Sequence, residues 1–236
     1  MSRPKPRTLA LGVVAVVVMV ALAHRHDDVQ PSPPAGHDSP DTTTALRQLA
    51  ALPVLATRPH HPGYQRGCGH GQACSFGPAW TDNTTGPGGH NACDTRNDTL
   101  AGQLTHVTYR PGSRCVVTAG TLHDPYTGHS IAFSKAHGSA VQIDHMVPLA
   151  LAWDLGADAW PLAKREAYAN DERVVLLAVS GPANESKADS GPAIWLPPDT
   201  TYRRTYAVRF VAVLSAYHLP VTAPDKSALT AALKGH

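Results

Sequence analysis

The sequence predicts an α+β domain in which strands and helices are mixed without a regular βαβ alternation. Three short runs separated by turns that contain Pro and Gly predict strands over residues 104–109, 115–118 and 130–133. Residues 202–217 instead repeat apolar side chains at helical spacing. Both patterns in one chain of 236 residues indicate a single domain with extra strands and C-terminal helices.

The N-terminal 23 residues have the pattern of an export signal. Basic residues precede an apolar run, and Ala21-Leu22-Ala23 provides the small residues that signal peptidase requires. An uncleaved anchor is the alternative, but the apolar stretch over residues 9–23 is shorter than the roughly 20 residues that cross a bilayer. We therefore expect cleavage after Ala23, no stable membrane insertion, and a secreted, extracellular protein.

Removal of this signal changes the net charge. It carries three of the 20 Lys and Arg residues and none of the 18 Asp and Glu, which leaves 17 basic and 18 acidic residues and a formal charge of −1. A nearly neutral protein cannot hold nucleic acid by its overall charge. Any binding of nucleic acid must therefore use a local basic patch.

We predict that residues 24–58 form a flexible tether that contains one short helix. Its first part is polar and interrupted by prolines. Leu46, Leu49 and Leu52 then form an apolar stripe, which we expect to dock onto the domain of residues 59–236. We expect this domain to be a monomer.

The remaining elements are predicted from apolar periodicity and turn residues. In chain order these are a short apolar run over residues 140–147, helices over 149–155 and 161–170, a buried strand over 174–179, a helical turn opened by Gly181-Pro182, and a last helix after Thr222.

Asp144 and His145 stand together at the end of the apolar run, before Pro148. At a bend, both side chains can reach one cleft. Oxygen ligands such as the Asp144 carboxylate and the Asn184 amide suit Mg²⁺ or Mn²⁺, and a neutral His145 imidazole can take a proton from water. Phosphodiester hydrolysis needs both parts. Taken alone, however, an Asp-His pair is common, and Asn184 would serve equally well as a helix cap.

Nearly the whole mature domain, from about residue 51 to 219, resembles secreted bacterial HNH endonuclease-family proteins. The resemblance is carried by several sequence blocks in the same order. These are residues 63–66 (GYQR), 76–82 (FGPAWTD), 93–97 (CDTRN), 124–128 (DPYTG), 143–149 (IDHMVPL), 169–171 (AND), 176–179 (LLAV), 184–189 (NESKAD) and 195–198 (WLPP).

This resemblance implies a ββα-metal (HNH) core, with two strands, a short helix and one divalent metal ion between them. Carried over by position, His145 is the general base, and Asp144 and Asn184 are the metal ligands. Mg²⁺ is the favoured ion, and Mn²⁺ or Zn²⁺ are the alternatives. Lys187 lies one helical turn after Asn184 and is a candidate to contact a substrate phosphate.

The resemblance is incomplete at one position. HNH domains usually place an Asn just before the second strand, where it helps to orient the base, but Glu172 and Arg173 precede this strand here. The nearest candidate is Asn170. It fills the supporting role or only caps the preceding helix, and the sequence leaves both open.

Arg96 and Asp94 are further candidates in the CDTRN block. A planar guanidinium binds two phosphate oxygens, so Arg96 is a candidate catalytic residue. The alternative is an Asp94–Arg96 ion pair that only shapes the loop, and we expect a supporting, structural role for Asp94.

The four cysteines of an exported chain indicate two disulfides, with three pairings open from the sequence alone. The family resemblance implies Cys93–Cys115. Cys68 and Cys74 then close a small Gly-rich loop.

The sequence analysis therefore predicts a metal-dependent HNH endonuclease that acts outside the cytoplasm on nucleic acid, with DNA favoured over RNA. The rival hypothesis is a catalytically silent cell-surface or nucleic-acid-binding module on an HNH-like scaffold.

Overall fold

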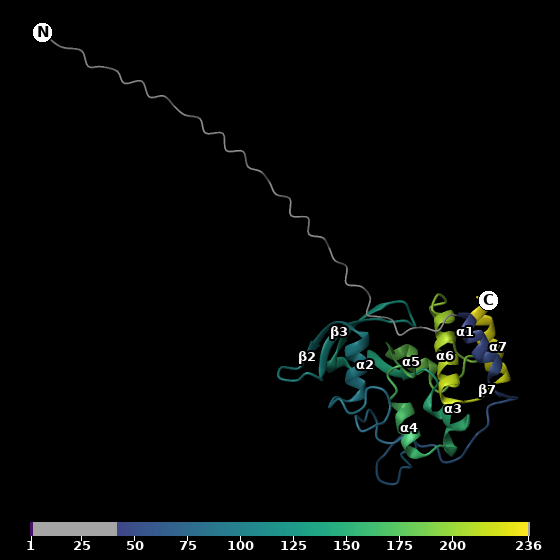
Figure 1. The fold of residues 1–236 in the computed structure, drawn as a ribbon. Helices are drawn as coiled ribbons and strands as arrows, with labels where there is room; N and C mark the ends of the chain where they lie inside the picture. Colours follow the sequence, from purple (N-terminus) through teal and green to yellow (C-terminus); the bar gives the residue numbers. More distant parts are fainter. Residues whose placement is uncertain (2–41, 236) are drawn as a thin grey trace. The chain divides into compact units, whose positions relative to one another are not determined.

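The structure is a computed structural model that describes residues 42–235 together with Met1 (Figure 1). The expected signal peptide and residues 24–41 of the expected tether lie outside the described residues. Several helices and three small sheets occur together, which confirms the α+β class. Within the described part of the chain, no helix is long and apolar enough to cross a membrane.

The largest sheet is antiparallel and contains β2 (Thr105–Tyr109), β3 (Val117–His123) and β4 (Ser130–Ser134) in that order. β2 and β4 agree with the strands predicted over residues 104–109 and 130–133, whereas β3 begins two residues after the start of the strand predicted over 115–118 and extends five residues beyond its end. A 3-10 turn, η1 (Lys135–His137), follows β4 and leads toward β5.

Helix α2 (Thr95–Gln103) precedes this sheet and was not predicted. The sequence gives it only a weak apolar pattern, because Leu100 is its one large buried apolar side chain. Its start is fixed by Asp94, whose side chain accepts a hydrogen bond from the backbone N–H of Asn97. The helix packs against both β3 and β6.

Strands β5 (Val141–His145) and β6 (Leu176–Ser180) form a separate antiparallel pair, in which His145 lies opposite Leu176. Helix α5 (Gly181–Lys187) follows β6 without a break. The Ser180 side chain accepts a hydrogen bond from Ala183 at its start, and Pro182 occupies its first turn. These three elements carry most of the predicted site residues.

The chain between β5 and β6 contains α3 (Leu149–Asp154), the 3-10 turn η2 (Ala157–Ala159) and α4 (Leu162–Ala169). The helices agree with those expected over residues 149–155 and 161–170. This connection returns the chain to β6 and brings the end of α4 next to the end of β5.

Three helices pack together on one side of the domain: α1 (Thr42–Ala51), α6 (Arg203–Tyr217) and α7 (Ala223–Lys234) (Figure 1). After α1, the two-residue strand β1 (Val54–Leu55) pairs in parallel with β7 (Val221–Thr222).

Helix α1, which precedes the predicted domain start at residue 59, packs into the main core. Ala45 and Leu49 of α1 are buried in the same apolar core as the rest of the domain. The apolar stripe thus docks onto the domain, as expected from the sequence.

Both predicted disulfides are confirmed, because Cys68 is bonded to Cys74 and Cys93 to Cys115. The second joins the residue before the cap of α2 to the chain just before β3.

A test of this packing is Gly181→Ala at the first position of α5. A Cβ there would overlap the Ser139 carbonyl oxygen, which belongs to the chain leading into β5. We expect a loss of about 1–3 kcal/mol in the free energy of unfolding, measured by urea titration.

The matched control is Gly102→Ala in α2, where nothing lies within 4 Å of an added Cβ. This variant should gain about 0.5–1 kcal/mol, because alanine restricts the unfolded chain. Equal stability of the two variants would contradict the close packing at Gly181.

Candidate active site

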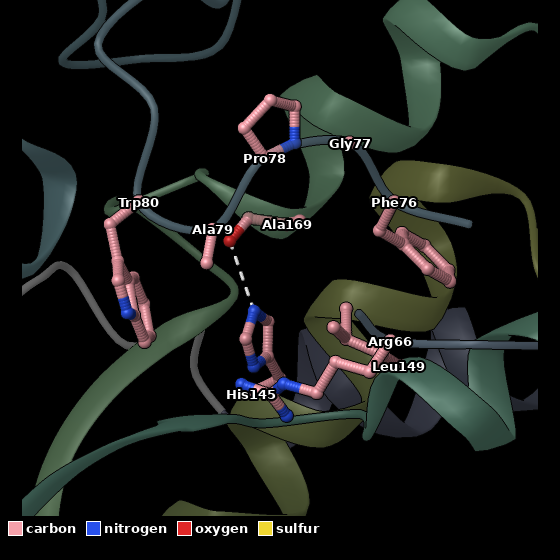
Figure 2. A pocket seen from close by; sticks show the side chains of 9 residues that line it. All are labelled: Arg66, Phe76, Gly77, Pro78, Ala79, Trp80, His145, Leu149 and Ala169. Atoms are coloured by element: carbon pink, nitrogen blue, oxygen red, sulfur yellow. Dashed lines mark hydrogen bonds between the residues drawn. The ribbon is translucent and has the colours of Figure 1, made fainter. Parts of the chain in front are cut away.

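His145 is the last residue of β5 and is 6% exposed. Its Nε2 atom lies 3.0 Å from the carbonyl oxygen of Ala169 at the end of α4 (Figure 2). A carbonyl oxygen only accepts hydrogen bonds, so Nε2 carries the proton of the neutral ring. The Nδ1 atom keeps a free lone pair and makes no hydrogen bond within residues 42–235. The ring is thus held in a tautomer that can accept a proton at Nδ1.

The surroundings of His145 keep the ring neutral. Burial lowers its pKa to about 3, and the positive charge of Arg66 adds to this effect, while the Ala169 carbonyl opposes it.

Two side chains from the loop before α2 lie against His145. The Trp80 indole is nearly parallel to the imidazole, at 5.9 Å between ring centres and 21° between planes. Arg66 extends toward the same ring (Figure 2), and it makes no hydrogen bond with the described residues. An arginine with free N–H groups beside a histidine is suited to bind an anion.

We call the hollow in front of these residues the site cavity. It brings together all the predicted metal ligands, the predicted base and several polar side chains from the loops. Its walls include Tyr64, Arg66, Trp80, Arg96, Gln142, Asp144, His145 and Asn184.

Asp144 precedes His145 and is almost completely buried. Its Oδ2 atom accepts hydrogen bonds from the Tyr126 hydroxyl and the Lys187 ammonium, each at 2.5 Å. Its Oδ1 atom makes no hydrogen bond with the described residues, and Asp144 lines the site cavity. One carboxylate oxygen is therefore held by the protein, and the other remains for a ligand.

Lys187 does not have the predicted phosphate-binding role. Its side chain is 0% exposed. The ammonium donates to Asp144 and also to the carbonyl oxygens of His145 and Met146, at 2.9 and 3.0 Å. Burial lowers the pKa of Lys187, and the Asp144 carboxylate opposes that shift. All three ammonium protons have partners inside the protein, so this lysine is a structural cation.

The Asp-Pro-Tyr-Thr-Gly turn positions Tyr126 for its contact with Asp144. The buried Asp124 carboxylate accepts from the backbone N–H groups of Tyr126 and Thr127 within the turn. It also accepts from the N–H of Ser180 at the end of β6. A single carboxylate thus attaches this turn to the start of α5.

Asn184 lies on α5 and faces the site cavity. Its Nδ2 atom donates to Gln142 Oε1 at 2.8 Å, and its Oδ1 atom has no hydrogen-bond partner among the described residues. Asp144 and Asn184 therefore each present an unused oxygen. In residues 42–235 no three His, Cys, Asp or Glu side chains cluster as a metal site. A cation here would depend on these two oxygens together with water or substrate.

Asn170 has the helix-capping position that the sequence offered as one of its two roles. This buried residue caps α4, because its Nδ2 atom donates to the Glu166 carbonyl at 2.9 Å. The group that orients His145 is the adjacent backbone carbonyl of Ala169. Asn170 thus fixes the end of α4, next to the carbonyl that contacts His145.

Asp94 lies at the start of α2, whereas Arg96 extends to the site cavity. Asp94 caps α2, and no ion pair joins it to Arg96 among the described residues. Arg96 reaches the site cavity and donates to the carbonyls of Gly138 and Val141 at 3.3 and 3.2 Å. Burial lowers the pKa of Arg96, and Asp94 opposes the shift. Asp94 thus caps a helix, and Arg96 lines the same cavity as His145.

Three groups of this site were not singled out from the sequence. Arg66 and Tyr126 lie in blocks that carry the family resemblance, so the blocks were a usable signal. The Ala169 carbonyl is a backbone group and leaves no signal in residue type.

The buried ion pair predicts that Lys187→Met is less stable than the parent protein. This variant leaves the Asp144 carboxylate buried without its cation, which should cost about 3–5 kcal/mol in the free energy of unfolding. Adding Asp144→Asn removes the unpaired charge and should recover most of that loss. Urea titration of both variants tests the pair, and an unchanged Lys187→Met would contradict its importance.

The lowered pKa of His145 predicts that the free energy of unfolding depends on pH. Its folded pKa of about 3 lies below the ordinary value of 6.5, so the unfolded chain binds a proton first as the pH falls. The contribution of His145 is complete above pH 6.5 and is lost progressively toward pH 3. We expect a loss of about 2 kcal/mol between pH 7 and pH 5 from this residue. His145→Gln should lack it, and identical pH profiles of the two proteins would contradict the shift.

Comparison with known proteins places this chain among nuclease-family sequences. Residues 94–232 match the model of the GmrSD restriction endonuclease C-terminal domain. The chain is also 35% identical over 206 residues to an uncharacterized secreted protein of the fungus Arthroderma benhamiae, which covers 86% of this chain and 88% of that protein. No solved structure matches. This chain therefore belongs to the family of GmrSD restriction endonuclease C-terminal domains.

Proposed function

We propose that this protein is a metal-dependent endonuclease of the HNH type that hydrolyses phosphodiester bonds in nucleic acid outside the cytoplasm, with DNA favoured as substrate. The family match supports a nuclease that acts on nucleic acid. The order of β5, β6 and α5 supports the HNH type, because a ββα-metal core has the same succession of elements.

One observation carries this proposal. The hydrogen bond from His145 Nε2 to the Ala169 carbonyl leaves Nδ1 as the basic nitrogen, in a cavity also lined by Arg66, Asp144 and Asn184. A base, a phosphate-binding cation and two oxygen ligands are the groups that phosphodiester hydrolysis requires.

In the proposed reaction, Arg66 binds oxygens of the scissile phosphate, and Arg96 adds positive charge beside it. A water molecule gives a proton to His145 Nδ1 while its oxygen bonds to phosphorus. The bond from phosphorus to the leaving ester oxygen breaks, and that oxygen takes a proton from solvent. The Ala169 carbonyl stabilises the imidazolium that forms.

The oxygens of Asp144 and Asn184 fit a hard divalent cation, with Mg²⁺ favoured and Mn²⁺ or Zn²⁺ as alternatives. Two protein ligands are few, but Mg²⁺ usually keeps several waters and binds substrate phosphate as well. When bound, the cation would supply charge that stabilises the phosphate and the leaving oxygen.

Action outside the cytoplasm is supported by the two disulfides, which persist in oxidising compartments. The relative whose name describes a secreted protein supports it as well. A signal peptide cleaved after Ala23 remains our prediction, and so does the bacterial origin, because that relative is fungal.

The rival function is a catalytically silent module that binds nucleic acid or the cell surface. The Lys187–Asp144 pair favours it, because a cation already neutralises the predicted metal ligand. Activity in the presence and absence of metal separates the two hypotheses.

The test is the nicking of supercoiled plasmid by the purified protein with Mg²⁺ or Mn²⁺ and with EDTA. We expect cleavage only with metal. His145→Ala should reduce the rate by about 10²–10⁴-fold, because it removes the general base.

His123→Ala is the matched control. This histidine is exposed on β3, where its ring contacts the Ser130 hydroxyl, and it does not line the site cavity. The control should cut at the rate of the parent protein. Cleavage by His145→Ala within a few-fold of the parent would show that His145 is not the base, and no metal-dependent cleavage of either plasmid or single-stranded DNA by the parent would favour the silent module.

A further inference from the structure

Trp80 adopts a backbone conformation that is rare for a large residue. Its φ is +58°, in the left-handed region that disfavours side chains with a Cβ. The start of α2 holds it there, because Thr95 donates its backbone N–H to the Trp80 carbonyl and its hydroxyl to the Thr81 carbonyl. Strained residues that the surroundings hold in place occur preferentially at functional sites.

The strained backbone places the indole between two cavities. Trp80 and Arg96 line the site cavity, and both also line a neighbouring hollow that we call the side cavity. The side cavity extends past Arg96 to Lys135, the first residue of η1 after β4. The indole is only partly buried, so a ring from solvent can contact it.

Three cations follow this path, in a protein whose expected mature charge is close to zero. Arg66 lines the site cavity, Arg96 lines both cavities, and Lys135 lines the side cavity. Arg66 and Lys135 are exposed and make no hydrogen bond with the described residues. An aromatic ring among cations is the usual composition of a groove that binds an unpaired strand of nucleic acid.

The depth of His145 also bears on the substrate. At 6% exposure the base lies below the surface, between Trp80 and the end of α4. A phosphate must enter the cavity to reach Nδ1. A flexible single strand can bend into such a recess, whereas a duplex would first have to be distorted or unpaired.

We propose that the substrate is an unpaired nucleic-acid strand that runs from the site cavity over Trp80 into the side cavity, with one base stacked on the indole and phosphates bound by Arg66, Arg96 and Lys135. This inference rests on the proposed nuclease function and names its substrate class. Stacking on one aromatic ring tolerates any base, so cutting should show little sequence selectivity.

The experiment measures binding and cutting with the same fluorescein-labelled oligonucleotide, as a single strand and as a duplex with its complement. Binding is followed by fluorescence anisotropy in EDTA, and cutting by gel electrophoresis with Mg²⁺ or Mn²⁺. We expect the parent protein to bind the single strand at least about ten-fold more tightly than the duplex, and to cut it faster.

Two substitutions of Trp80 separate stacking from folding. Trp80→Asn removes the ring but suits the left-handed backbone, because Asn tolerates positive φ. It should keep a cooperative thermal transition and lose about ten-fold in affinity for the single strand, with little change for the duplex. Trp80→Tyr keeps a ring and should retain affinity within about three-fold.

Lys135→Ala tests the far end of the path. It should weaken binding of the single strand and reduce the slope of log affinity against log salt by about 0.7, the value for one phosphate contact. Lys234→Ala is the control, since this exposed lysine ends α7 and lines neither cavity.

The outcomes distinguish this inference from the proposed function. Metal-dependent cutting of the duplex as fast as the single strand, or single-strand affinity unchanged in a folded Trp80→Asn, overturns the inference and leaves the nuclease intact. Absence of cutting with any metal overturns the nuclease, and preferential single-strand binding that depends on Trp80 and Lys135 would still support the binding path.

Discussion

The buried ion pair between Lys187 and Asp144 holds α5 against the end of β5. The same ammonium bonds the carbonyls of His145 and Met146, so it fixes both the carboxylate and the backbone that carries the base. Each charge would be uncompensated in the core without the other. The carboxylate, the base and the helix that carries Asn184 therefore reach their positions together, when α5 docks.

The orientation of His145 depends on a second, longer connection. The chain leaves β5, passes through α3 and α4, and returns with the Ala169 carbonyl facing Nε2. Asn170 and Asp171 stabilise this return, because the first caps α4 and the second accepts the Tyr217 hydroxyl from α6. The tautomer of His145 is thus set by the tertiary fold, through groups well separated from it in sequence.

The sequence predicted best what is local. Periodicity and turn residues located most strands and helices, and Asp144, His145 and Asn184 do meet in one cavity. The burial of the Lys187 side chain was not predictable from the sequence. Its i+3 spacing from Asn184 gives no information about the Asp144 carboxylate on β5, with which it pairs. Helix α2 was missed because it buries few large apolar residues, and its stability depends on the Asp94 cap and on packing against β3 and β6.

The disulfide between Cys93 and Cys115 lies immediately before the cap of α2 and ties that helix start to the sheet. Arg96 belongs to the first turn of α2, and the same turn holds the Trp80 carbonyl. In a compartment that keeps thiols reduced this covalent tie is missing, and the turn is ordered by the Asp94 cap, by the hydrogen bonds of Thr95 and Arg96, and by local packing. Arg96 and the indole are then held less firmly, so this disulfide links the order of the candidate site to the redox state of its surroundings.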